Sequence, residues 1–276
     1  MKKVLLALLG AALMAGATIS HASPEQDRKE ILDYLKHKSP NIPFEDYVYG
    51  ALAYSPDALD QYKAVMDFPP FIGVIDEGKK MWDTPFKNGQ TYAGCMPNGG
   101  KNIAGNYPMF DNKLNTVVTL QMVINECREK NGEKPYAYKD MKTMGVLTAY
   151  MRTLSDGMKT DIKVEGPAAL AAYEHGKKHF FQRRGQLNFS CATCHLYNAG
   201  NIIRTEYLSP ILGHSTHWPV FRGGEKLFTL EARYVGCNKT VRAVPFEPGS
   251  DEYKDLEYFE SYISNGLPLE ASVFRK

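Results

Sequence analysis

The first apolar run of the chain lies at its N-terminus, and its flanks distinguish it from a membrane span. Lys2 and Lys3 precede a mainly apolar stretch, residues 4–19, and the small residues Ser20 and Ala22 follow it. A basic start, an apolar middle and small residues at the exit are typical of a cleaved export signal. The run is shorter than the ~20 apolar residues of a spanning helix. We therefore predict a signal peptide over residues 1–22, a mature protein in the bacterial periplasm, and no membrane insertion.

Three later segments have the composition and the spacing of helices. Residues 168–181 are rich in helix formers, and residues 253–263 carry aromatic side chains at helical spacing before an Asn-Gly pair. Such a pair is a common end signal for a helix. Residues 143–154 form a matching segment earlier in the chain, and long stretches with Pro, Gly and Asn separate the three. The pattern predicts a mostly α protein with long irregular connections.

The pattern also repeats, with a period of roughly 100 residues. Gly-Lys-Lys begins at residue 78 before Cys95, and begins again at residue 176 before Cys191. Cys127 is followed by Tyr-Lys-Asp and Ser-Asp-Gly, and Cys237 by Tyr-Lys-Asp and Ser-Asn-Gly. We predict two tandem domains related by duplication, residues 23–157 and 158–276, with the linker at residues 157–167.

The second half contains a C-x-x-C-H motif formed by Cys191, Cys194 and His195. In an exported chain this spacing indicates c-type haem attachment, because two thiols three positions apart can form thioethers with the two vinyl groups. The histidine that follows can give its imidazole to the iron. A zinc knuckle or a redox pair is the alternative, but the chain has no second C-x-x-C that would complete a zinc site. The motif predicts one covalently bound haem c.

The first half lacks this motif. At the corresponding place Cys95 is followed by Met-Pro-Asn-Gly, so that the second thiol and the histidine are both replaced. Cys95 and Cys127 nevertheless remain in a domain without its cofactor. A disulfide between them would close a loop of about 32 residues, worth ~3–4 kcal/mol. Oxidising compartments favour this pairing. The alternative is two free buried thiols.

The iron would need a second axial ligand. The last methionine, Met158, precedes the predicted haem domain, which leaves His214, His217 and Cys237 as candidates within it. Cys237 is the odd cysteine of five, and Arg233 lies four residues before it. A thiolate on ferric iron would be reinforced by this positive charge and would lower the haem potential. From the residues alone, a thiolate ligand and an inert buried cysteine beside a histidine ligand both remain open.

The charge balance narrows the range of partners. The chain has 33 basic and 31 acidic side chains, and removal of the signal takes away two of the basic ones. A near-neutral mature protein gives no indication of nucleic acid or of a charged membrane surface as a partner.

Taken together, these motifs resemble those of the SoxA subunits of bacterial sulfur-oxidation systems. The resemblance lies in Arg-Gly-Gln-Leu before the C-A-T-C-H, in Gly-His-x-x-His-Trp-Pro-Val-Phe-Arg at residues 213–222, and in Arg233-x-x-x-Cys237. It covers most of the mature chain, including two cytochrome c-like halves. The family includes members with two haems and members whose N-terminal haem is replaced by a disulfide. This chain is similar to the second kind.

The resemblance implies an L-cysteine S-thiosulfotransferase. Such a subunit pairs with the cytochrome SoxX, oxidatively joins thiosulfate to a cysteine of SoxY in the SoxYZ carrier, and passes the electrons through haem to SoxX. By position, Cys191 and Cys194 would hold the haem and His195 would be the proximal ligand. Cys237 would be the distal ligand and the catalytic sulfur, which is persulfidated in family members. Arg233 would bind the anionic substrate with a guanidinium that can offer parallel hydrogen bonds.

Two other functions remain open at this stage. A thiosulfate dehydrogenase would join two thiosulfates to tetrathionate without a carrier protein. A non-catalytic electron carrier would have a haem with Met or His ligation. Residues 23–45 have no assigned role, and a disordered arm and a partner interface are both open for them.

Overall fold

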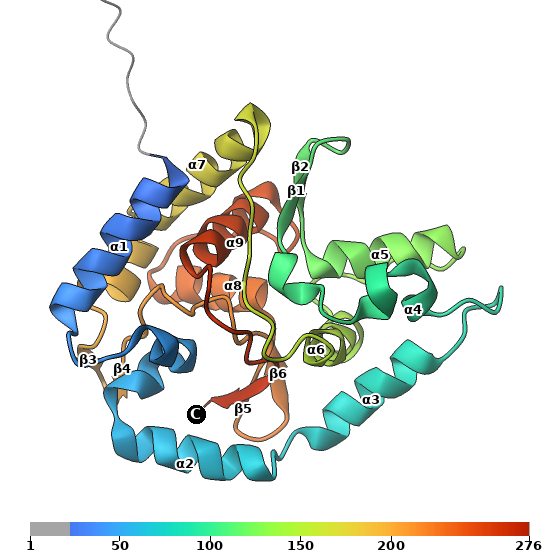
Figure 1. Ribbon diagram of the computed structural model, residues 1–276, viewed down its shortest axis with the longest axis horizontal. Helices are drawn as coiled ribbons and strands as arrows, with labels where there is room; N and C mark the ends of the chain where they lie inside the picture. The colour runs from blue at the N-terminus through green and yellow to red at the C-terminus, as the bar shows by residue number, and fades with distance from the viewer. Residues whose placement is uncertain (1–22, 276) are drawn as a thin grey trace, which may run out of the picture.

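Helix α1, Pro24–Lys38, opens the part of the chain that the computed structural model describes, residues 23–275 (Figure 1). Ser23 caps this helix by accepting a hydrogen bond from the Gln26 backbone N–H. Asp27 is buried and pairs with Lys177 of the second half at 2.6 Å. The alternative of a disordered arm is therefore wrong for this segment. The predicted signal peptide lies outside the described residues.

The first half is a series of short helices with one β-hairpin. In chain order its elements are η1 Phe44–Tyr54, α2 Pro56–Asp67, α3 Ile72–Asp83, α4 Tyr92–Cys95, η2 Pro97–Gly100, η3 Ala104–Asn106, β1 Met109–Asp111, β2 Thr116–Val118, α5 Leu120–Lys130, η4 Met141–Gly145 and α6 Val146–Thr153. β1 and β2 pair antiparallel. The helix predicted over 143–154 is confirmed, although its first turn is π-helical.

The second half has longer helices and two small sheets. Its elements are α7 Pro167–Phe181, η5 Thr193–Tyr197, β3 Ile202–Ile203, β4 Glu206–Tyr207, β5 Val220–Arg222, β6 Lys226–Phe228, α8 Leu230–Thr240, α9 Asp251–Ile263 and β7 Val273–Arg275. β5 is the central strand of the larger sheet, antiparallel to β6 and parallel to β7. α7 and α9 confirm two of the predicted helices, and the mostly helical prediction holds for the described residues.

In each half, two helices cross where a glycine permits close approach. A Cβ added to Gly78 of α3 would lie 2.7 Å from the Val146 carbonyl oxygen of α6. A Cβ added to Gly176 of α7 would lie only 1.9 Å from the Asp255 carbonyl oxygen of α9. Both distances are too short for any side chain, so each crossing depends on its glycine.

The described residues form two large hydrophobic clusters and a smaller one. One core surrounds Ile124 and Met144, and the other is built around Tyr173 and Phe259. α1 packs on the second of these cores. The smaller cluster joins the two halves through the rings of Phe71 and Phe221, which stack with centroids 4.0 Å apart. Within residues 23–275, no helix combines the length and the apolar character that crossing a bilayer demands.

Candidate functional site

The C-x-x-C-H motif follows a tight loop after α7, in which the backbones of Arg184 and Phe189 pair. Arg184 at the start of this loop donates hydrogen bonds to the Asn238 side chain at 2.7 Å and to the Val244 carbonyl at 3.0 Å. Asn238 follows Cys237 in α8. The Arg184 guanidinium therefore ties the loop before the motif to the helix that carries Cys237. Cys191 and Cys194 are both free thiols of intermediate burial.

The His195 side chain is held in a defined orientation. Its Nδ1 donates to the Ser209 carbonyl oxygen at 2.9 Å. This bond places the ring proton on Nδ1, so that the lone pair lies on Nε2. Burial lowers the pKa of His195 to about 3, with a smaller contribution from His214, and the imidazole is neutral. A backbone carbonyl that accepts from the other ring nitrogen is the usual second-shell partner of a metal-bound histidine.

Helix α8 presents Arg233 and Cys237 one turn apart. Thr229 caps this helix by accepting from the Ala232 backbone N–H. Burial raises the pKa of the Cys237 thiol, while the charge of Arg233 opposes this rise. After burial, the charge of Cys237 is among the causes that raise the pKa of both Cys191 and Cys194. The three free thiols therefore lie within one another's electric field.

His214 and His217, the other candidate ligands, are both buried. The His214 ring stacks on the His195 ring, with centroids 4.5 Å apart and planes 29° apart. His214 thus lies against the face of the His195 ring, and its Nδ1 is bonded to Glu260 at 3.1 Å. The His217 ring stacks on Trp218 instead, at 5.6 Å.

These residues fit a c-type haem. Two free thiols stand at the correct spacing, the imidazole that follows has its Nε2 available, and a third free thiol shares their field. Among the described residues, no group of three or more His, Cys, Asp and Glu side chains is arranged to hold a metal ion by itself. Two thiols followed by an imidazole are the donors that covalent haem attachment and iron ligation use.

The first half is different at the corresponding place. Cys95, the last residue of α4, is disulfide-bonded to Cys127 of α5, with their Cα atoms 5.8 Å apart. The predicted pairing is thus present in the structure. Asn98 and Gly99, which stand where the second half has a thiol and an imidazole, form a tight turn with positive φ angles.

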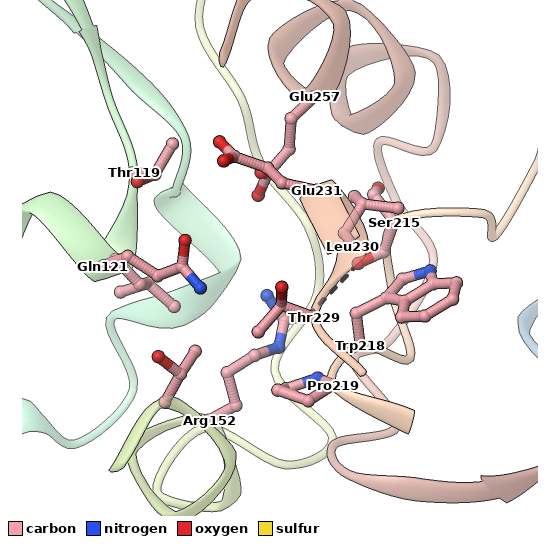
Figure 2. Close-up of a pocket in the computed structure, with 12 residues that line it drawn as sticks. Thr119, Gln121, Arg152, Ser215, Trp218, Pro219, Thr229, Leu230, Glu231 and Glu257 are labelled. Atoms are coloured by element: carbon pink, nitrogen blue, oxygen red, sulfur yellow. Dashed lines mark hydrogen bonds between the residues drawn. The ribbon is translucent and has the colours of Figure 1, made fainter. Parts of the chain in front are cut away.

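A small polar cavity lies between the two halves and contains none of the predicted site residues (Figure 2). Its volume is about 30 Å³, which is room for about two water molecules. Arg152 of α6 lines it and donates to the Ser215 and Thr216 carbonyls at 3.3 and 3.2 Å. Glu231 and Glu257 also line it, and burial raises their pKa values to about 8 and about 7.

Sequence reasoning did not find the residues that join these parts. Glu260 of α9 and Tyr234 of α8 are buried and hydrogen-bonded to each other at 2.7 Å. Arg152 connects the first half to the segment after His214. Their partners are far away in sequence, so spacing carries no information about them. The one available signal was a glutamate inside the aromatic helical segment predicted over 253–263.

Comparison with known proteins identifies similar chains. The family model for the SoxA/TsdA cytochrome c domain matches residues 77–160, within the half that lacks C-x-x-C-H. The L-cysteine S-thiosulfotransferase subunit SoxA of Allochromatium vinosum is 43% identical, over 98% of this chain and 98% of its own length. The subunit of the same name from Chlorobaculum tepidum is also 43% identical, over 96% and 95%. The crystal structure of SoxXA from P. pantotrophus superimposes with a TM-score of 0.71 at 30% identity, covering 79% of this chain and 84% of that one.

Proposed function

Since the chain belongs to the SoxA family of L-cysteine S-thiosulfotransferase subunits, we propose that it conjugates thiosulfate to a cysteine of a SoxY carrier with Cys237 as the reacting sulfur. The observation that carries this assignment is the cluster of three free thiols and Arg233 beside a neutral histidine with a fixed ring proton. An inert buried cysteine would need no guanidinium one turn away on the same helix.

The cofactor assignment follows from the donors. Cys191 and Cys194 would hold one haem c by thioethers, with His195 and Cys237 as its axial ligands. When bound, the haem supplies one-electron oxidation next to the sulfur. His214 is disfavoured as the distal ligand, because its ring stacks on the ring of His195, the proposed proximal ligand.

The protein's own task is to bring two sulfur groups together despite their charge. Joining thiosulfate to a thiol forms one S–S bond and releases one proton and two electrons. Thiosulfate carries two negative charges, and a thiolate beside it would repel it. Arg233 lies close enough to Cys237 for its charge to lower the pKa of that thiol, and Arg222 acts in the same direction. A guanidinium in this place can bind the sulfonate end through two parallel hydrogen bonds.

The two halves are, in this proposal, duplicated cytochrome c-like domains, residues 23–157 and 158–276, of which the first holds no haem. α5 and α8 each have 11 residues, each begins after a capping threonine, and each carries a cysteine at its eighth position. The hydroxyl of Ser155 accepts from backbone N–H groups of the first half, and Ser264 does so in the second. Cys127 would therefore correspond to Cys237, and the disulfide would join the first-half counterparts of Cys191 and Cys237.

The similarity to a SoxXA complex supports a SoxX cytochrome as the partner. We further propose that SoxX receives the electrons, that the SoxYZ complex presents the carrier cysteine, and that the reaction takes place in the periplasm.

The test replaces the proposed reacting sulfur in the haem-loaded protein bound to SoxX. Cys237→Ala should keep the covalent haem but lose thiosulfate-dependent conjugation, measured as the mass gain of the carrier. Lys239→Ala, an exposed position on the same helix, should retain it. Full conjugation by Cys237→Ala would overturn the proposal. Tetrathionate formed without any carrier would indicate the dehydrogenase, and a bis-His paramagnetic resonance signature would indicate a simple electron carrier.

A further inference from the structure

The carboxylate of Glu260 is completely buried, with 0% of the residue exposed, in the last turn of α9. Its Oε2 accepts a hydrogen bond from the Tyr234 hydroxyl at 2.7 Å and is bonded to Nδ1 of His214 at 3.1 Å. Its Oε1 has no hydrogen-bond partner. Burying a carboxylate is expensive unless its oxygens are paired. A half-paired acid in a core is therefore expected to have a role besides stability.

One arm of this network reaches the helix that carries the reacting sulfur. Tyr234 lies beside Arg233 in sequence and one turn before Cys237. Its backbone carbonyl accepts from the Asn238 side chain at 2.9 Å, and Asn238 in turn accepts from Arg184 before the C-x-x-C-H motif. The Tyr234 hydroxyl therefore fixes the rotation of α8 relative to α9.

The other arm reaches the proposed proximal ligand. The His214 ring that is bonded to Glu260 lies against the face of the His195 ring. The segment around His214 is fixed to α9 a second time, because Ser264, one turn after Glu260, accepts from the Gly213 backbone N–H at 3.1 Å. The Trp218 indole N–H also donates to the His214 carbonyl at 2.6 Å. His214 has no freedom to leave His195 while Glu260 holds its ring.

A charge on Glu260 also lies close to the proposed proximal ligand. Its Oε2 is 3.1 Å from Nδ1 of His214, and the His214 ring stacks on the His195 ring with centroids 4.5 Å apart. A nearby negative charge stabilises the oxidised state of any redox centre.

We propose that Glu260 is a positioning residue of the sulfur site: its Oε2 joins α8, which presents Cys237, to the His214 ring that supports His195, and its charge stabilises the oxidised haem. This inference rests on the proposed ligand roles of His195 and Cys237. It adds to them a residue that touches neither ligand and acts through Tyr234 and His214.

The test compares three variants of the haem-loaded complex with SoxX. Glu260→Gln removes the charge and weakens both arms. Tyr234→Phe removes one arm and leaves the charge. Glu257→Gln is the matched control, because it makes the same exchange at a half-buried glutamate about one turn earlier on the same helix. The readouts are the electron paramagnetic resonance spectrum of the ferric protein and the reduction potential from a redox titration.

We expect Glu260→Gln to split or shift the low-spin thiolate signal. It should also raise the ferrous-to-ferric ratio at fixed applied potential about tenfold, equivalent to about 59 mV for a one-electron couple. Tyr234→Phe should alter the signal but leave the ferrous-to-ferric ratio at the same applied potential within a few-fold of that of the parent. Glu257→Gln should change neither readout.

The outcomes separate this inference from the function on which it rests. A parent protein without any thiolate signal would overturn the ligand assignment itself. A parent with the thiolate signal, and a Glu260→Gln variant with the same signal and potential, would overturn the role of Glu260 alone. Should Glu260→Gln fail to retain haem, an unchanged spectrum in Tyr234→Phe would overturn the positioning role in the same way.

Discussion

The cavity between the two halves makes a quantitative prediction about stability and pH. Glu231 is buried there, and its side chain accepts a hydrogen bond from the Gly249 backbone N–H. Burial, followed by the charge of Glu257, raises its pKa from 4.5 to about 8. The folded protein therefore binds a proton at this site in a pH range where the unfolded chain has released it. We predict that Glu231→Gln flattens the dependence of stability on pH.

The sign and the size follow from the two pKa values. The stability that comes from the neutral carboxyl is fully present below pH 4.5 and is lost as the pH rises through about 8. At 1.36 kcal/mol for each pKa unit, the loss has an upper limit of about 5 kcal/mol. Glu257 shares the cavity, and its proton uptake is coupled to that of Glu231. We therefore expect the free energy of unfolding to fall by about 2–5 kcal/mol as the pH rises. Glutamine has the same shape, can still accept from Gly249, and cannot ionise.

The measurement is urea unfolding of the haem-loaded protein from pH 5 to pH 9, followed by two spectroscopic probes. Parent and Glu231→Gln should have similar free energies of unfolding near pH 5, and the variant should be more stable by about 2–5 kcal/mol at pH 9. Glu225→Gln, at an exposed position, should follow the parent at every pH. Parallel curves for parent and Glu231→Gln over the whole range would refute the reasoning.

Two further predictions concern the framework. Replacing Cys95 and Cys127 together by alanine opens a loop with a sequence separation of 32 and should lower the free energy of unfolding by about 3–4 kcal/mol; an unchanged denaturation midpoint with haem still bound would contradict this. Gly176→Ala forces a Cβ against the Asp255 carbonyl and should cost at least about 1–3 kcal/mol, seen as a lower melting temperature. Gly73→Ala in α3, where nothing lies within 4 Å of the added Cβ, should instead be neutral or stabilising by up to about 1 kcal/mol, and equal losses at both positions would contradict the packing argument.

The parts of the fold that the sequence predicts are those fixed by local chemistry. α7 and α9 follow from runs of helix formers and from an Asn-Gly end signal, and both form where expected. The Cys95–Cys127 pairing follows from a cysteine count in an oxidising compartment. α1 was not predicted, because its sequence is strongly polar and its place depends on the ion pair between Asp27 and Lys177, 150 residues apart.

The residues of the candidate site also fall into those that local sequence patterns predict and those that only the fold brings together. The C-x-x-C-H motif is a local pattern, and Cys237 stands out because it is the odd cysteine. The residues that orient these groups come together only in three dimensions: Tyr234 and His214 meet on Glu260 across separations of 26 and 46 residues. No periodicity or spacing in one sequence encodes such a meeting. The sequence does show that Glu260 is an acid within a helical segment rich in aromatic residues. It does not indicate which residues Glu260 contacts.

The first half contributes to the candidate site through Arg152. A disulfide joins α4 to α5 of this half, and the Arg152 side chain extends from α6 into the second half. There the guanidinium holds the carbonyls of Ser215 and Thr216, the two residues that follow His214. The His214 segment is consequently fixed from two directions, by Glu260 of its own half and by Arg152 of the other. A half that carries no C-x-x-C-H thus supports the ring that lies against His195, which gives a physical reason for keeping it folded around a disulfide.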